Sequence, residues 1–245
     1  MRFKIELELK NEHLPLDYRP AVISLFKHSL TLYEDGKYFS NYYELGKVKP
    51  FTFAVVIPNS TFTKEFILVP RKKIYISFST NDMGTGIVFF NALMMQKNKS
   101  YPLAYGNVMI VKNILIEKEY IITTNTIEVI FRSPLCVREH NKEMNRDIYY
   151  SHEKEGFNEV LNKILEVQIA SSNTLPTFIL EGFSMIPVDC KKTVVKHHSQ
   201  FIEVTIGAFK LTGNIALLNY LYSNGIGSRK SSGFGMFEVM RKENL

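Results

Sequence analysis

The sequence predicts an α+β protein built from two βαββαβ units in tandem. The chain has 245 residues, which is long enough for two small α+β units. Strand-like and helix-like patterns follow one another as strand, helix, strand, strand, helix, strand, and this order recurs in the second half. It is the order of the ferredoxin-like, RNA-recognition-like fold. No self-similarity at a fixed period is present, so the pattern of elements carries the predicted duplication.

The first predicted unit covers residues 1–122. Residues 2–9 alternate apolar and charged side chains, which is the period of a half-buried strand. Residues 18–33 place Val22, Phe26 and Leu30 along one stripe, which predicts an amphipathic helix. The other predicted elements of this unit are strands at 51–57, 64–78 and 108–122 and a helix at 85–95.

The second predicted unit covers residues 123–245, with the seam near 123–125. Residues 127–131 predict a strand, and residues 156–170 carry apolar side chains at helical spacing. Residues 142–154 are charged and predict a loop or the entry to a helix. The other predicted elements are strands at 178–187, 201–211 and 234–240 and a helix at 214–222.

Composition favours a cytoplasmic protein and is compatible with a polyanionic partner. The 30 Lys and Arg against 24 Asp and Glu give a net charge of +6, which suits a polyanion without requiring one. The two cysteines, Cys136 and Cys190, are far apart, which argues against a disulfide scaffold or a zinc ribbon. No apolar run approaches the ~20 residues that span a bilayer, so we expect no membrane association.

Residues 225–235 form the most informative segment, a run of four glycines around Ser-Arg-Lys-Ser-Ser. Glycine reaches positive φ at little cost, and the backbone N–H groups it leaves open can converge on an anionic oxygen. A nucleotide-binding loop is not predicted, because a helix precedes this segment and a strand follows it. The alternative is structural: Gly225 and Gly227 cap the preceding helix, and Gly233 and Gly235 kink the strand.

This segment has two glycine pairs around a basic insert, and it continues as Phe-Gly-Met-Phe-Glu-Val. It resembles the glycine-rich loop of the RAMP superfamily, whose members are the RNA-binding components of CRISPR systems. The whole chain is most similar to the endoribonuclease that cuts precursor CRISPR RNA in its repeats. The length, the opening residues 1–5 and the central Ser133-Pro134-Leu135 support this likeness, although only the loop is specific as a motif. The resemblance implies two ferredoxin-like domains with the loop at the cleft between them.

The resemblance also implies that this loop contacts the RNA backbone. Its predicted RNA-binding residues are Gly225, Gly227, Ser228, Arg229, Lys230, Ser231, Gly233 and Gly235. Arg132 and Arg138 flank the central Ser-Pro-Leu-Cys run and are added as candidates that face RNA in the central groove. The basic clusters at 71–73, 191–192 and 196–198 are better explained as solvated charge on hairpins.

The family that the chain resembles cuts RNA without a metal, by attack of the ribose 2′-oxygen on the adjacent phosphorus, which leaves a 2′,3′-cyclic phosphate and a 5′-hydroxyl. Such a reaction needs a proton acceptor, a proton donor and positive charge beside the phosphorane. Typical members supply a tyrosine from the first helix and a histidine and a lysine from the segment after it.

This chain carries those residue types at shifted positions. In the run 42–52, Lys49 matches the family's lysine, but Tyr43 stands at the histidine position. The tyrosine position of the helix falls at Lys27, with His28 beside it. The predicted catalytic set is drawn from these residues, with His28 or Tyr43 as acid or base and the lysines stabilising the phosphorane. On the helical wheel His28 points away from the apolar stripe, so Lys27 reaches a cleft more easily.

The sequence therefore predicts a metal-independent endoribonuclease, without a cofactor, whose partner is CRISPR repeat RNA. Other subunits of a CRISPR effector complex are further candidate partners, and monomer and homodimer stay open. The alternative is a non-catalytic RNA-binding subunit of such a complex, favoured by Tyr43 in place of histidine. An RNA-recognition protein unrelated to CRISPR is a third option. His197 and His198 are neighbours on a predicted strand, so they should face opposite sides and suit no single metal ion.

Overall fold

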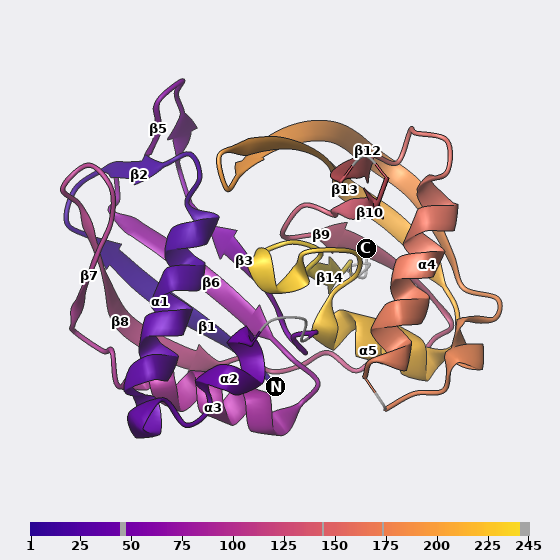
Figure 1. Cartoon of the computed structure of the whole chain (residues 1–245), viewed down its shortest axis with the longest axis horizontal. Coiled ribbons are helices and arrows are strands. Elements are labelled where there is room, and N and C mark those ends of the chain that lie inside the picture. Colours follow the sequence, from indigo (N-terminus) through magenta and orange to yellow (C-terminus); the bar gives the residue numbers. More distant parts are fainter. Residues whose placement is uncertain (45–47, 144, 173, 241–245) are drawn as a thin grey trace, which may run out of the picture.

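The computed structural model describes residues 1–44, 48–143, 145–172 and 174–240, and it has two lobes. Each lobe is an antiparallel sheet with helices packed against it (Figure 1). The strands of the two main sheets have the orders β3-β6-β1-β8-β7 and β12-β13-β9-β14. The first four positions of each order correspond to the second, third, first and fourth strands of a βαββαβ unit. The predicted tandem ferredoxin-like fold is therefore confirmed.

The N-terminal lobe follows the predicted order of elements. Its main elements are β1 (Arg2–Leu9), α1 (Arg19–Leu32), β3 (Thr52–Val56), β6 (Lys73–Ser79), α3 (Met83–Met94) and β8 (Val108–Ile116). The shorter elements are β2 (His13–Pro15), the 3₁₀ turn η1 (Tyr33–Gly36), α2 (Phe39–Tyr43), β4 (Thr61–Phe62), β5 (Phe66–Leu68) and the edge strand β7 (Ser100–Pro102). Ile5 pairs with Ile76 on one side and Ile114 on the other, which sets the buried face of the sheet.

The C-terminal lobe repeats this arrangement with additions. Its main elements are β9 (Thr126–Phe131), α4 (Phe157–Ala170), β12 (Ser184–His197), β13 (Gln200–Thr212), α5 (Ile215–Asn224) and β14 (Phe237–Val239). The additions are the hairpin β10 (Val137–Asn141) and β11 (Arg146–Tyr150) and the 3₁₀ turns η2 (Thr177–Leu180) and η3 (Lys230–Ser232). Asn214 caps α5 because its side-chain oxygen accepts from the N–H of Ala216 at 2.9 Å.

Each lobe has its own hydrophobic core. The first core runs from Phe3 to Ile114 and includes stacked Phe3 and Phe78, whose ring centroids are 4.7 Å apart. The second core runs from Ile122 to Phe237. We propose that residues 1–122 and 123–245 form the two domains. Ile122 packs into the second core, so the exact boundary lies within a few residues of this position.

Several predicted elements differ from the structure. The charged segment 142–154 contains β11, because its tyrosines pair across to β10 instead of facing solvent as a loop. The strand predicted at 178–187 begins only at Ser184, after η2. The expectation that His197 and His198 face opposite sides is wrong: His198 lies at the hairpin turn with φ of 48°, and the two rings are 4.4 Å apart.

The lobes meet along a polar seam. The alternation of residues 2–9 predicts that Arg2 lies on the polar side of its strand, but it is only 2% exposed. Its guanidinium lies 4.2 Å from the centroid of the Tyr222 ring and donates to the Phe237 carbonyl. Glu238 adds an ion pair to Arg2 at 3.3 Å. The tip of the β12–β13 hairpin also reaches the N-terminal lobe, where the N–H of Ser199 donates to Asp17. These contacts fix how the lobes lie around the glycine-rich loop.

Candidate RNA interface and active centre

The glycine-rich loop, residues 225–235, lies between the two lobes (Figure 1). It connects α5 to β14 and is hydrogen-bonded to the N-terminal lobe by Arg19 and Thr52. The Nε of Arg19, at the start of α1, donates to the Gly233 carbonyl at 3.2 Å. The hydroxyl of Thr52, at the start of β3, donates to the Phe234 carbonyl at 2.9 Å. Arg19 also packs on the Phe234 ring, 4.6 Å from its centroid.

The four glycines are required by the backbone conformation of the loop and by its close neighbours. Each has positive φ, and a Cβ at Gly235 would lie 2.0 Å from the Ile226 carbonyl oxygen. A Cβ at Gly227 would lie 2.6 Å from the Cys136 carbonyl oxygen. Gly225 is the C-cap of α5, as the structural alternative predicted. The glycines therefore let the loop fold tightly between its neighbours.

Most of the loop N–H groups that could meet a phosphate already have partners. The N–H of Gly225 donates to Leu221, that of Gly235 to Pro134, and that of Ser228 to Cys136. The expectation that backbone N–H groups of the glycines converge on an anion is therefore wrong for Gly225, Gly233 and Gly235, whose N–H groups are used within the protein. RNA contact through the loop stays a prediction, and its basic and hydroxyl side chains are the groups left to make it.

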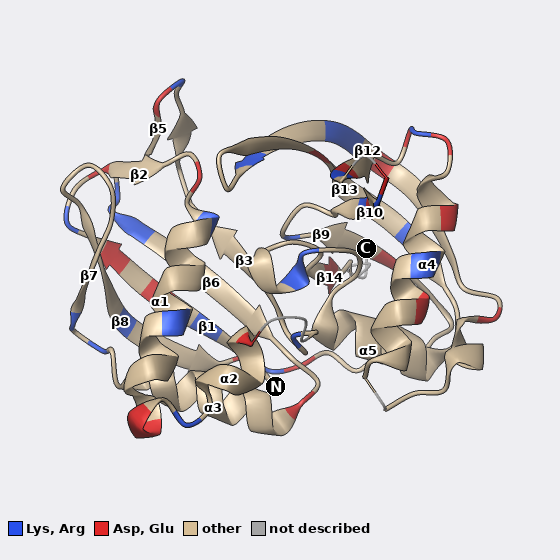
Figure 2. Ribbon diagram, in the orientation of Figure 1, with Lys and Arg blue, Asp and Glu red and all other residues tan. Residues whose placement is uncertain are grey.

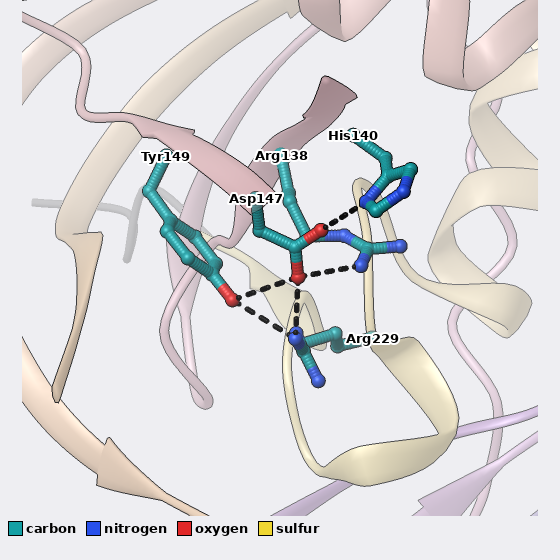
Figure 3. Close-up of polar contacts among 5 residues, drawn as sticks. All are labelled: Arg138, His140, Asp147, Tyr149 and Arg229. Atoms are coloured by element: carbon teal, nitrogen blue, oxygen red, sulfur yellow. Dashed lines mark hydrogen bonds and ion pairs between the residues drawn. The ribbon is translucent and has the colours of Figure 1, made fainter. Parts of the chain in front are cut away.

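A cluster of charged side chains ties the loop to the β10–β11 hairpin (Figure 3). Asp147 accepts from Arg229 at 3.1 Å, from Arg138 at 2.8 Å and from His140 at 2.9 Å. Arg229 also donates to the Tyr149 hydroxyl at 2.9 Å. Partial burial raises the pKa of Asp147, but the hydrogen bonds from Arg138 and His140 and the charge of Arg229 outweigh it and lower the pKa to about 2.

Lys230 is the buried cation of the loop. It is 8% exposed, and burial lowers the pKa of its ammonium to about 7. Lys230 and Lys49 together line two cavities between the lobes, one beside α4 and one beside the start of α3. The basic part of the loop lies between α1 and α4 (Figure 2). The loop thus presents positive charge to the same space as the segment before β3.

Lys27, Tyr43 and Lys49 lie together, and we call them the lysine–tyrosine cluster. The Lys27 Nζ, from α1, lies 5.1 Å from the centroid of the Tyr43 ring, and the Lys49 Nζ lies 5.5 Å from it. Tyr43 ends α2, and Lys49 precedes β3. Chain neighbours 45–47, which belong to the run used to align Tyr43 and Lys49, lie outside the described residues. Helix α1 and the segment before β3 thus each place an ammonium group near the Tyr43 ring.

The protonation of this cluster is set by burial. Burial raises the pKa of the Tyr43 hydroxyl, which is enclosed and has no hydrogen-bond partner within the described part of the chain. Burial, and then the charge of Lys27, lower the pKa of Lys49. At neutral pH Tyr43 is therefore protonated, and Lys49 gives up its proton more easily than an ordinary lysine.

His28 does not join the lysine–tyrosine cluster. It is exposed on α1, and its ring lies 5.3 Å from that of Tyr101 on the edge strand β7. Ser24, one turn earlier, bonds the Tyr101 hydroxyl at 2.6 Å, so this helix face is directed to β7. The helical wheel correctly separated His28 from Lys27. A catalytic role for His28 stays a prediction without geometric support.

The two central arginines have different surroundings. Arg138 lies in the charged cluster around Asp147 and lines the cavity beside α4, so it borders the loop. Arg132 is exposed just after β9, where its N–H donates to the Met236 carbonyl. Sequence reasoning missed Asp147, because its segment has no motif, and Arg19, whose only signal is its place before a helix-starting proline.

The sequence profile described as CRISPR associated protein Cas6, C-terminal, matches residues 115–239, which is more than half of the chain. The chain belongs to the Cas6 family. No curated protein sequence matches it significantly. Among the described residues, no helix is both long and apolar enough to cross a membrane.

Solved Cas6 structures share the fold over almost the full length. The product of a Cas6-related gene from Pyrococcus furiosus aligns with a TM-score of 0.85 at 18% identity, covering 99% of each chain. An RAMP protein binding different RNA substrates aligns at 0.82 and 19% identity, covering 98% of this chain and all of the other. A Cas6 product complex aligns at 0.72 and 15% identity, with the same coverage. At these identities the likeness establishes the double ferredoxin-like fold.

Proposed function

We propose that this Cas6 protein binds CRISPR repeat RNA along the space between its lobes and cleaves it at the lysine–tyrosine cluster. The observation that carries the proposal is that Lys49 of this cluster and Lys230 of the glycine-rich loop line the same two cavities. A strand of RNA held by the basic loop would therefore pass its backbone beside Tyr43 and Lys27. The Cas6 product complex and the RNA-binding RAMP protein, which share this fold, support the proposal that the chain binds RNA.

The chemistry follows from the protonation of the cluster. Lys49, with its lowered pKa, fits the acceptor of the 2′-hydroxyl proton. Tyr43 keeps its proton at neutral pH and would donate to the departing 5′-oxygen once bound RNA uncovers its enclosed hydroxyl. Lys27, exposed on α1, supplies positive charge beside the phosphorane. Attack by the 2′-oxygen breaks the bond to the 5′-oxygen, leaving a 2′,3′-cyclic phosphate and a 5′-hydroxyl. No metal ion takes part in these steps.

A second candidate is a non-catalytic RNA-binding subunit with the same surfaces. The observation that favours it is that Tyr43 occupies the position where the resemblance expects histidine and that its hydroxyl is enclosed. In this case the loop and the lysines bind the backbone, but the cluster lacks a group that exchanges a proton readily near neutral pH.

One assay separates these candidates. The protein is incubated with the repeat RNA of a CRISPR array from its own genome in excess EDTA, and the RNA is resolved on a denaturing gel beside a binding titration. Cleavage at one bond supports the nuclease. Tight binding with the RNA intact supports the second candidate, and neither binding nor cleavage would overturn both.

The buried ammonium of Lys230 predicts a pH dependence of RNA affinity. A bound phosphate favours the charged form, so binding takes up a proton once the pH exceeds the pKa of about 7 in the free protein. We expect the dissociation constant to rise between pH 7 and pH 8 by up to about fivefold. At pH 6 and below, at least about one unit under that pKa, the lysine is already protonated and this contribution is flat.

Two variants isolate that effect from other titrating groups. Lys230→Arg keeps its charge across this range, so its affinity should lose the pH-dependent component. Lys230→Met should bind more weakly at pH 6 and also lack that component. Fluorescence anisotropy with labelled repeat RNA measures all three proteins, and an equal slope in the wild type and Lys230→Met would contradict the prediction.

A further inference from the structure

A cavity of about 510 Å³ lies between α4, the glycine-rich loop and the segment before β3, and we call it the α4 cavity. Its walls include Val48, Lys49, Ile164, Val167, Gln168 and Lys230. The volume falls within the roughly 300–1,000 Å³ typical of small-molecule sites. The Asp147 cluster holds the loop side of the cavity in place through Arg229 and Arg138.

The α4 cavity has an apolar wall and a rim that is mostly cationic, with Glu139 as the carboxylate among its described lining residues. On the apolar side Val167 of α4 is 64% exposed and Val48 is 54% exposed, so both leave hydrocarbon surface open to an occupant. On the other side lie Lys49 and Lys230, and within the described ranges neither ammonium has a carboxylate at ion-pair distance. An occupant with a flat apolar face and an attached anion matches both sides.

The floor of the cavity has an unused acceptor. Gln168 is 5% exposed, and its amide N–H donates to the Gly225 carbonyl at 3.1 Å. Its side-chain oxygen has no hydrogen-bond partner in the part of the chain that the structure describes. That oxygen is itself enclosed, so a donor on the occupant reaches it only when the amide turns toward the cavity. Leaving a buried acceptor unpaired is unfavourable, so such a turn would be stabilised by the donor. The edge of a nucleobase carries such N–H donors.

We propose that the α4 cavity binds the unstacked nucleobase of the nucleotide next to the bond that is cut. Single-stranded RNA is read in this way, with bases splayed out of the stack into protein pockets. Lys49 belongs to both the cavity and the lysine–tyrosine cluster, so a base seated here places its own phosphate at that cluster. The inference rests on the proposed function and names the contact that sets the position of the cut.

Binding of RNA that cannot be cut tests this directly. A series of repeat RNAs carries 2-aminopurine at one position each, with a single 2′-deoxynucleotide at the bond that the wild type cuts in unmodified RNA. The described residues that line the cavity include no aromatic side chain, so a base seated there should lose its stacking partners and fluoresce more strongly. We expect a severalfold rise on binding at the nucleotide beside the cut.

A matched pair of variants assigns that signal to the cavity. Val167→Phe fills the cavity from an exposed position of α4. Glu166→Phe adds the same ring at the preceding residue, which lies beside η2 and outside the cavity. Val167→Phe should abolish the fluorescence rise and weaken RNA binding. Glu166→Phe should bind and fluoresce like the wild type.

The outcomes separate the inference from the proposed function. If RNA binds but no position brightens, or if both phenylalanine variants behave alike, the base-binding cavity is wrong and RNA binding stands. If the brightening position lies away from the cut, the cavity does not set the cleavage site, and the inference fails. If unmodified RNA is bound but never cut, the 2-aminopurine series is repeated without the 2′-deoxynucleotide. A position that brightens in the wild type but not in Val167→Phe then establishes the base site, while the proposed cleavage is wrong.

Discussion

Replacing Lys49 by alanine slows cleavage of repeat RNA by roughly 10²–10³-fold, the usual loss when one group that stabilises developing charge is removed. Lys49 lies 5.5 Å from the Tyr43 ring, and burial together with Lys27 lowers its pKa, so it combines proton exchange and charge in one side chain. The measurement is the single-turnover rate at saturating protein, which separates chemistry from binding. RNA affinity should fall much less than the rate.

Two further variants locate the effect in the lysine–tyrosine cluster. Tyr43→Phe keeps the ring between the two ammonium groups and removes only the hydroxyl, so a rate loss of about 10²-fold would identify the proton donor. His28→Ala removes an exposed imidazole beside Tyr101 and should leave the rate within about twofold of the wild type. A large loss in His28→Ala with a small loss in Lys49→Ala would contradict this assignment.

The second large effect is expected from Gly235→Ala, which should destabilise the protein by roughly 2–5 kcal/mol. A Cβ there would lie 2.0 Å from the Ile226 carbonyl oxygen, and φ of 73° is unfavourable for alanine. The loop would have to shift away from Pro134, to which the Gly235 N–H now donates. We expect a melting temperature lower by roughly 5–15 °C and weaker RNA binding.

Gly106→Ala is the matched control. Gly106 also has positive φ, at 62°, but a Cβ there meets nothing within 4 Å. The substitution should therefore cost only about 1 kcal/mol, from the backbone conformation alone, and leave RNA affinity unchanged. Thermal unfolding and an RNA titration on both variants test the comparison. Equal losses of stability in both would show that close packing of the loop is unimportant.

The fold could be predicted from the sequence wherever only one face of a helix or strand is buried. Residues 2–9 alternate because one face of β1 packs on the core, and α1 shows a single apolar stripe for the same reason. The hydrophobic pattern failed to predict the structure where tertiary contacts determine it. Residues 146–150 become β11 because they pair with β10, and Arg2 is buried because Tyr222 and Phe237 of the other lobe satisfy it. Neither contact leaves a local signal.

The site was predictable in part. Lys27, Tyr43 and Lys49 were chosen by resemblance, and the structure does bring them together, although their roles remain predictions. The glycine-rich loop was found by its composition, but the reason for its glycines is close backbone packing, which sequence spacing does not reveal. The burial of Lys230 was also hidden, because a lysine in a polar run reads as solvated.

The most direct test of the account is cleavage of a repeat RNA in which one 2′-hydroxyl, at the nucleotide 5′ to the cut, is replaced by hydrogen. If the 2′-oxygen is the nucleophile, this RNA is bound with unchanged affinity and stays intact in EDTA, while the unmodified RNA gives products ending in a 2′,3′-cyclic phosphate and a 5′-hydroxyl by mass spectrometry. Cutting of the modified RNA at the same bond would show that another nucleophile acts, and would contradict the mechanism placed at Lys27, Tyr43 and Lys49.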